Sequence, residues 1–303
     1  MTITGPSYLA LGREELRRRI EAAWELMRQP CRVCPRRCEV DRAADDRRGF
    51  CRVGARAVVF SYHPHFGEER PLVGTHGSGT IFFSSCNLAC VYCQNWEISQ
   101  LRLGQEVEPP QLAAIMLRLQ EMGCHNVNLV SPTIYTPQIL AALPAAIDGG
   151  LRIPFVYNTG GYDCVEMLRL LEGVVDIYMP DIKYSHEKTA GRYSAVKDYY
   201  ARTKEAVREM HRQVGDLAVE AGVAVRGLII RHLVLPGGLA GTEEVMRFIS
   251  QEISPDSYVN IMDQYRPENK AMRYRELSRR ITRLEVAEAI AVARRHGLWR
   301  FAP

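Results

Sequence analysis

Residues 77–95 read GSGTIFFSSCNLACVYCQN, a short apolar run followed at once by Cys86, Cys90 and Cys93. Such a run is typical of a buried strand, so the cysteines are expected at the end of that strand. From here onward the chain repeats an apolar run and then a helix. Strands are expected over residues 80–84, 126–130, 154–158, 174–179, 227–235 and 258–262. Helices are expected over residues 109–122, 137–147, 164–171, 201–221, 242–253 and 284–296.

This alternation predicts an α/β fold, in which helices cover a parallel sheet. Six strand–helix units are too few for a closed eight-stranded barrel, so an open, partial (β/α)6 barrel is expected over residues 79–303. Residues 1–78 are expected to form a separate part, with a helix over residues 7–28 and then a small, loop-rich module. Chemistry in such folds collects at the carboxyl ends of the strands, where the three cysteines fall.

The composition is that of a folded chain. Of its 303 residues, 47% are hydrophobic and 24% charged, and no apolar run approaches the ~18 residues of a membrane span. No signal-peptide pattern opens the sequence, so a cytoplasmic protein is expected. The net charge is +4, but residues 1–56 alone hold thirteen Arg against eight acidic residues. These arginines are either a solvated surface or a docking site for an acidic protein such as a flavodoxin.

Nine cysteines in an expected cytoplasmic protein indicate metal or redox chemistry rather than disulfides. Three thiolates spaced by three and then two residues would leave one iron of a four-iron cluster without a protein ligand. That open position would make the iron a binding site for a substrate or cofactor. The alternative is a zinc knuckle completed by a histidine, of which His76 is nearest in sequence.

Cys86-x3-Cys90-x2-Cys93 resembles the signature of radical S-adenosylmethionine (SAM) enzymes. The sequence around it resembles the PflX-type proteins, relatives of pyruvate formate-lyase activating enzyme. The resemblance continues in VYNTGGYD (156–163), DIYMPDIKY (176–184), RHLVLPGG (231–238) and DQYRP (263–267). It implies a [4Fe-4S] cluster on the three cysteines, with the amino and carboxylate groups of SAM on the fourth iron.

The same resemblance implies a reaction. A one-electron donor such as flavodoxin or ferredoxin would reduce the cluster, and SAM would be cleaved to methionine and a 5′-deoxyadenosyl radical. The radical would remove a hydrogen atom from the substrate, which in activating enzymes is a glycine of a partner protein. The competing hypotheses are modification of another protein or of a small molecule, a plain electron-transfer protein, and a zinc-stabilised nucleic-acid-binding module. Nucleic acid is the weaker prediction, because no aromatic residues alternate with the basic ones.

Resemblance also implies a set of SAM-binding residues at the strand ends. They are Tyr92, Ser131, Thr133, Asn158, Thr159, Asp181, Lys183 and Arg231. Ser131 and Thr133 stand where related enzymes have a Gly-Gly-Glu segment. Asn158, Thr159 and Asp181, with the Met179 carbonyl, would hold a monovalent cation, although Asn158 replaces an Asp of the family pattern. Lys183 and Arg231 would meet a carboxylate or ribose oxygen of SAM, or else form a salt bridge across the strand ends.

A second cysteine group precedes the expected barrel. Cys31, Cys34, Cys38 and Cys51 offer four thiolates in a segment without a core of its own. Four ligands close a site, whether it holds zinc or a second [4Fe-4S] cluster, and the short Cys-Pro spacing favours the cluster.

Two polar segments complete the candidates. His63, His65, Glu68 and Glu69 would be loop residues with ordinary hydrogen bonds, or else metal ligands or the lining of a substrate entrance. Gln264, Tyr265 and Arg266 follow the sixth expected strand and would face a bound substrate.

Overall fold

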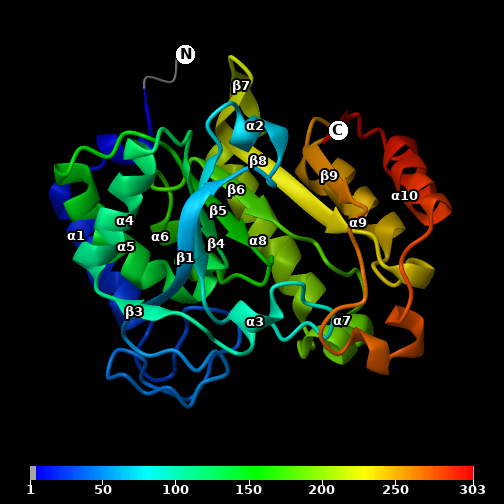
Figure 1. Ribbon diagram of the computed structural model, residues 1–303, viewed down its shortest axis with the longest axis horizontal. Coiled ribbons are helices and arrows are strands. Elements are labelled where there is room, and N and C mark those ends of the chain that lie inside the picture. Colours follow the sequence, from blue (N-terminus) through cyan, green and yellow to red (C-terminus); the bar gives the residue numbers. More distant parts are fainter. Residues whose placement is uncertain (1–4, 303) are drawn as a thin grey trace.

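A mostly parallel sheet forms the centre of the computed structural model, which describes residues 5–302 (Figure 1). Its strands are β1 (Ala57–His65), β2 (Ser78–Phe83), β3 (Gln105–Val107), β4 (Val127–Val130), β5 (Phe155–Thr159), β6 (Ile177–Pro180), β7 (Ala218–Glu220), β8 (Val223–Leu233), β9 (Tyr258–Met262) and β10 (Arg300–Phe301). Their order is β10-β9-β8-β6-β5-β4-β2-β1-β3, with β7 paired to β8. The run from β2 to β9 is parallel throughout, and β1 is antiparallel to both its neighbours. The predicted α/β partial barrel with six parallel strands is therefore confirmed.

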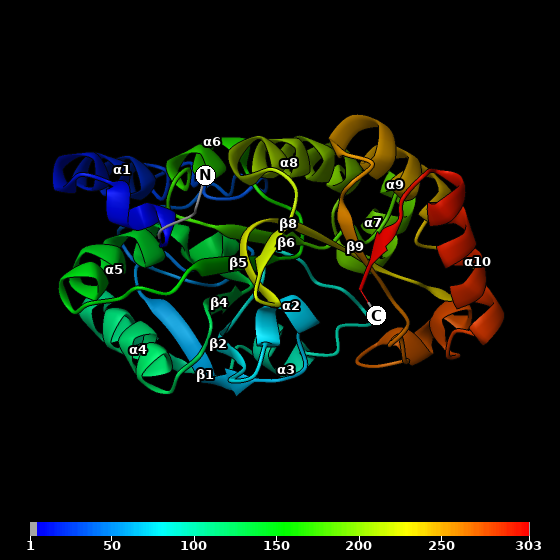
Figure 2. The same cartoon turned by 90° about the horizontal axis from the view of Figure 1, so that it is seen from above.

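Helices cover the outer, convex face of the sheet, as Figure 2 shows from above. They are α1 (Arg13–Glu25), α4 (Pro109–Glu121), α5 (Thr136–Asp148), α6 (Val165–Leu170), α8 (Tyr199–Val214), α9 (Thr242–Phe248) and α10 (Arg283–Arg295). Three short helices, α2 (Arg70–Val73), α3 (Trp96–Ser99) and α7 (Glu187–Ser194), lie in the connections. The main core lies between the sheet and the long helices, because apolar residues fill this face of every parallel strand.

Alternate residues of the same strands point to the inner, concave face. At its amino-terminal end this face is apolar, and Leu72 of α2 packs there against Val156, Ile177 and Ile229. Toward the carboxyl ends it becomes polar, with Asn158 on β5 and Arg231 on β8. The fold thus closes one end of the partial barrel and leaves polar groups at the other.

Several predicted boundaries were wrong. The helix expected over residues 201–221 ends at Val214, because Gly215 leaves helical geometry with φ of +70° and the β7–β8 hairpin follows. The helix expected over residues 7–28 is a short turn followed by α1. Strand β1 was not predicted, and its Pro64 is tolerated because this part of the strand is an edge.

The cysteine-rich loops of residues 31–56 (blue) lie below the carboxyl edge of the sheet in Figure 1, on the side of α3. The division of the chain at residue 78 stays a prediction. Within residues 5–302 no helix combines the length and the apolar character that crossing a bilayer requires.

Candidate active site

The loop of residues 84–95 carries the three cysteines directly beyond β2, at the carboxyl edge of the sheet. Cys90 is buried and the other two thiols are half-buried. Neighbouring segments fix the loop backbone. The amide of Ala89 donates to the carbonyl of Ser194 (3.2 Å), and the amide of Val91 donates to the carbonyl of Tyr193 (2.8 Å). The three thiols are therefore presented by a loop whose backbone is held on a rigid support.

Burial dominates the chemistry of these thiols. It raises the pKa of Cys86 to about 12 and that of Cys90 to about 11, and each thiol is close enough to Cys93 for its charge to add to the effect. Two hydroxyls also lie beside them: Cys90 Sγ is 2.9 Å from Ser194 Oγ, and Cys93 Sγ is 3.3 Å from Ser99 Oγ. Free thiols here hold their protons at neutral pH, and a bound metal centre would displace them.

A buried charged network lies at the ends of β5, β6 and β8. The Asp181 carboxylate accepts from Lys183 Nζ (2.5 Å) on one oxygen and from Arg231 Nε (2.7 Å) on the other. Arg231 also donates to Asn158 Oδ1 (2.6 Å). Burial disfavours the Asp181 charge, but Arg231 and Lys183 outweigh it and hold the pKa of this carboxyl below its usual range. Glu68 also faces Arg231, with 3.6 Å between its Oε2 and Nη1, so two carboxyl groups share the two cations.

The oxygens expected to hold a monovalent cation are already used. Both carboxylate oxygens of Asp181 and Oδ1 of Asn158 accept from the protein's own cations. The hydroxyl of Thr159 donates to Asp163 (2.6 Å). A metal cation would have to displace Lys183 or Arg231, and its presence stays a prediction.

Sequence analysis missed Asp163, which is 2% exposed and fixes the ends of two strands. Its carboxylate accepts from the hydroxyls of Thr133 (2.8 Å), Thr159 (2.6 Å) and Tyr157 (3.0 Å). The hydroxyls of two predicted SAM contacts, Thr133 and Thr159, are thus used in hydrogen bonds that stabilise the strand ends of the site. The sequence feature that could have indicated Asp163 is an acidic residue shortly after a Gly-Gly turn at the end of a strand. Gly161 is required in that turn, because a Cβ there would lie 2.2 Å from the Asp181 carbonyl.

Replacing Asp163 by Ala is expected to lower the free energy of unfolding by about 3 kcal/mol, because three buried hydroxyls lose their acceptor. Chemical denaturation measures the change. Asp148→Ala is the matched control, since it removes only an exposed pair with Arg13 and should cost less than about 1 kcal/mol. Equal losses in the two variants would contradict the assigned role.

The two remaining predicted SAM contacts lie on either side of the site. Ser131 follows β4 with φ of +59°, and its amide donates to the Asn158 carbonyl (2.9 Å). Tyr92 is buried against the rings of Tyr184 and Tyr265, with centroids 6.3 and 5.8 Å away. The Tyr92 hydroxyl is buried and makes no hydrogen bond within the described residues, so its neighbours would have to move before it could reach a ligand. The SAM-binding roles of all these residues stay predictions.

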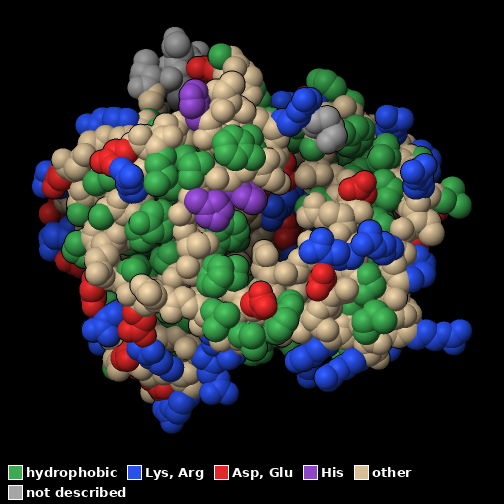
Figure 3. All heavy atoms as spheres, in the orientation of Figure 1, with side chains coloured by type: hydrophobic (Ala, Val, Ile, Leu, Met, Phe, Trp, Pro, Cys, Tyr) green, Lys and Arg blue, Asp and Glu red, His purple; other side chains and the backbone are tan. Residues whose placement is uncertain are grey.

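A cavity of about 400 Å³ opens beside the charged network, on the open side of the barrel. Arg231, Glu68 and Glu69 line it together with residues 260–264, Val286, Ile290 and Ala302. Asn260 donates to Glu69 Oε1 (2.9 Å) and so links β9 to the segment before α2. Figure 3 shows a hollow on this face, with histidines on one side and basic side chains on the other. The two glutamates therefore lie at the site rather than in a remote loop.

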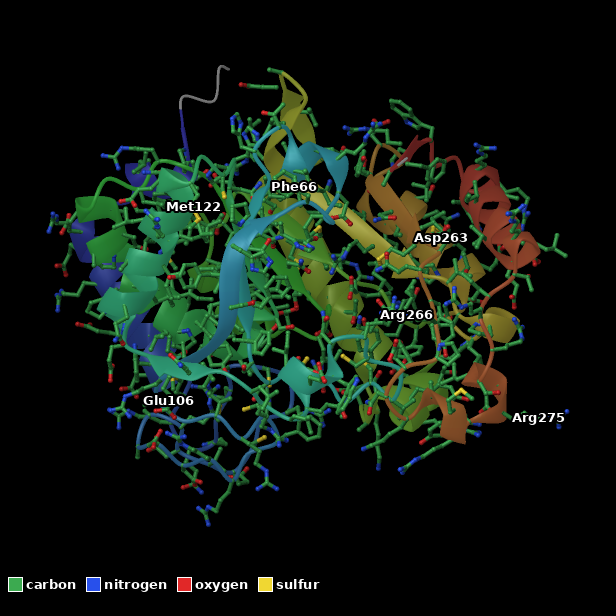
Figure 4. The ribbon with its side chains drawn as sticks, in the orientation of Figure 1. Phe66, Glu106, Met122, Asp263, Arg266 and Arg275 are labelled. Atoms are coloured by element: carbon green, nitrogen blue, oxygen red, sulfur yellow. The ribbon has the colours of Figure 1, made fainter. Side chains whose placement is uncertain are left out.

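The histidines border this opening without making a metal site. His63 and His65 contact the ring of Phe82, with centroids 5.4 and 5.6 Å away. Within residues 5–302 no three His, Cys, Asp or Glu side chains come close enough to share one ion. Figure 4 shows Asp263 and Arg266 beyond the end of β9, and Phe66 near α2.

The segment after β9 only partly meets its prediction. Gln264 lines the cavity, while the Arg266 side chain pairs with Glu268 (2.8 Å) and is half exposed. Tyr265 is buried and donates to the Leu277 carbonyl (2.7 Å), so its hydroxyl is used within the fold.

The pKa of Glu68 makes the stability of the folded protein depend on pH. Burial raises its pKa from 4.5 to about 7, against the opposing charge of Arg231. Between these values the folded chain keeps a proton that the unfolded chain has lost, so this group lowers stability as pH rises from 4.5 to about 7. Glu68→Gln should remove that decline. Thermal unfolding of both proteins from pH 4.5 to 8 measures it, and identical pH profiles would contradict the assignment.

Comparisons with known proteins add the family. The model of the Radical SAM superfamily matches residues 80–249, which is more than half of the chain. The chain belongs to the radical SAM superfamily. The "Uncharacterized protein MJ0674" of Methanocaldococcus jannaschii is 36% identical over 276 residues, covering 88% of this chain and 75% of the relative. The "Uncharacterized protein MJ0808" of the same organism is 23% identical over 249 residues, covering 75% and 68%.

Two solved structures show a distant likeness. One is "Structure of TYW1 with a lysine-pyruvate adduct bound", with a TM-score of 0.41, 12% identity, and coverage of 63% of this chain and 67% of that one. The other is "Native anSMEcpe with bound AdoMet", with a TM-score of 0.39, 11% identity, and coverage of 58% and 48%.

Radical SAM membership implies a [4Fe-4S] cluster and SAM, and the residues present fit both. A cubane binds each cysteine at a different iron, so its ligands surround the cluster and need not meet at one point. Three thiols on one supported loop, close enough to perturb each other's ionisation, meet that requirement. Lys183 and Arg231, whose counter-charges are Asp181 and Glu68, would provide polar contacts for SAM.

Proposed function

We propose that this protein removes a hydrogen atom from a glycine of a partner protein, as activating enzymes do. When bound, the cluster supplies the electron that splits SAM. Cys86, Cys90 and Cys93 would hold it, and Lys183 and Arg231 would orient the SAM carboxylate, which would compete with Asp181 and Glu68 for these two cations. Tyr92, which directly precedes Cys93, is the other proposed SAM contact. Within this proposal no monovalent cation is needed, because side-chain cations already occupy its oxygens.

The open side of the barrel is the observation that supports a polypeptide substrate. Within residues 5–302, the segment of β1 from Ser61 to His65 pairs with β2 alone, since β3 pairs with Ala57–Val59. Its outer edge is therefore free for an extended peptide to pair with. Phe66, at the end of this edge, is 63% exposed, as expected of a contact residue. The cavity beside Arg231 lies on the same open side.

The test is transfer of hydrogen from a labelled glycine. Purified protein, SAM and a reduced flavodoxin are incubated without oxygen with candidate glycyl-radical enzymes that carry unlabelled or α-deuterated glycine. We expect a glycyl doublet in the electron paramagnetic resonance (EPR) spectrum with unlabelled glycine, which collapses to a narrower line with α-deuterated glycine. Deuterium should then appear in 5′-deoxyadenosine, and both signals should be absent with Cys90→Ala. If SAM is cleaved and no candidate gives a doublet, the substrate is another protein or a small molecule.

The basic amino-terminal part supports an acidic electron donor as partner. Arg37 and Arg52 are exposed, and neither forms an ion pair with a described acidic residue. They lie in the loops on the same side of the sheet as the cysteine-bearing loop. Replacing both with Glu should lower the rate of reduction by flavodoxin several-fold at low salt. The decrease should be much smaller at high salt, because salt screens exposed charges. An unchanged rate at low salt would place the docking surface elsewhere.

A further inference from the structure

The second cysteine group surrounds a buried cation. Cys31, Cys34 and Cys51 are buried, Cys38 is half-buried, and the four thiols line one small cavity. Arg42 lines the same cavity and is only 2% exposed. The loops of residues 31–56 thus enclose four thiols and a guanidinium, while their buried valines, Val33, Val40 and Val53, belong to the main core.

Arg42 has no acidic partner within residues 5–302. Its Nε donates to the Val53 carbonyl (3.1 Å), and one terminal nitrogen donates to the carbonyls of Gly54 (3.5 Å) and Ile134 (2.7 Å). A guanidinium keeps its charge in proteins, and a buried charge without a counter-charge is strongly unfavourable. The four thiols line the same cavity as the guanidinium, so a metal centre that deprotonates them would supply the missing counter-charge.

The same cavity shares a wall with the radical SAM loop. Asn87, the residue after Cys86, lines it. Arg36 also lines it and donates from Nε to the Asn87 carbonyl (2.6 Å) and from a terminal nitrogen to the Ala195 carbonyl (3.0 Å). The thiols of Cys34 and Cys86 both lie close enough to Arg36 to affect its pKa. One arginine thus joins the two cysteine groups.

We propose that Cys31, Cys34, Cys38 and Cys51 hold a second, fully cysteine-ligated iron–sulfur cluster that passes electrons to the site at Cys86, Cys90 and Cys93. The four thiols line one small cavity, and the short Cys-Pro spacing favours a cluster over zinc. The negative charge of such a cluster balances Arg42. No position remains open for SAM, so electron transfer is the chemistry available to it.

One electron leaves a reduced flavodoxin or ferredoxin, passes through this second cluster, and reduces the radical SAM cluster. The carrier is oxidised by one electron and the radical SAM cluster is reduced by one, with no bond made or broken at this step. The relay rests on the proposed radical SAM chemistry, whereas the presence of the second cluster does not.

Metal content tests the site by itself. The triple variant C86A/C90A/C93A, reconstituted without oxygen, is expected to retain about four irons and four sulfides per chain. Zinc in their place, or a colourless metal-free protein, would overturn the proposal even if the native protein cleaves SAM. Conversely, retained iron in this variant would stand even if no SAM cleavage were found with native protein.

Arg42 gives a sharper readout. In the triple-variant background, Arg42→Met should lower the cluster's reduction potential, because a buried positive charge that favours the reduced form is lost, while Arg42→Lys should restore most of it. An unchanged potential in Arg42→Met would overturn the assigned charge pairing. The iron count of each variant shows that the cluster is still present.

The relay is tested in the chain with native Cys86, Cys90 and Cys93. Cys34→Ser should slow flavodoxin-driven SAM cleavage more than tenfold and change the rate with titanium(III) citrate less than twofold, since the small reductant reaches the open site directly. Equal rates with flavodoxin before and after the substitution would overturn the relay. Thermal unfolding of Cys34→Ser, and Cys124→Ser as the matched control away from both groups, separate a folding defect from a lost relay.

Discussion

Replacing Cys90 by Ala should reduce SAM cleavage to background and remove about four irons per chain, because a three-cysteine cluster has no ligand to spare. Cys90 is the most buried of the three thiols, so no solvent ligand can reach its position easily. Iron and sulfide counts, with chromatography of 5′-deoxyadenosine, measure both effects.

Cys124→Ala is the control for this substitution. Cys124 is 2% exposed and packs in the main core, away from the loop. Its replacement should cost about 1 kcal/mol of stability and leave iron and turnover unchanged. Full iron content with normal turnover in Cys90→Ala would show that the cysteine is not a ligand.

Replacing Asp181 by Ala should lower the free energy of unfolding by about 3–5 kcal/mol, since Lys183 loses its ion-pair partner and Arg231 keeps only Glu68, 3.6 Å away. The side chains of Lys183 and Arg231 are each only 16% exposed, so water can compensate little of the loss. Urea denaturation of the protein without SAM measures it. A loss below about 1 kcal/mol would mean that water screens the network.

A second substitution separates this charge effect from simple loss of packing. Asp181→Ala combined with Lys183→Met removes one stranded cation. The double variant should therefore lose less free energy of unfolding than the sum of the losses in the two single variants. Additive losses would show that Asp181 and Lys183 do not act as a pair.

Sequence alone predicted the six parallel strands, because each is an apolar run followed by a helix. It also placed Cys86, Cys90 and Cys93 beyond the first of them. Edge and hairpin strands escaped it: β1 reads AVVFSYHPH, whose later half is polar because it lies at a free edge. The end of α8 was misplaced because Gly215 alone marks it, and the residues after it read equally well as helix.

The candidate site likewise contains residues that the sequence could predict and residues that it could not. Spacing along the chain can identify three thiols within eight residues, but contacts between distant strands depend on the fold. Asp163 joins Thr133 to Thr159, and Arg231 reaches Asn158 across 73 positions. Arg42 appeared as one of many arginines, and only its burial among four thiols gives it a role.

The most direct test is the EPR spectrum of the dithionite-reduced protein before and after addition of SAM. If one cluster has an iron without a protein ligand, SAM should shift the g-values of one signal, and this shift should be absent in Cys90→Ala. A spectrum that SAM leaves unchanged, at concentrations well above those of the protein, would contradict the account.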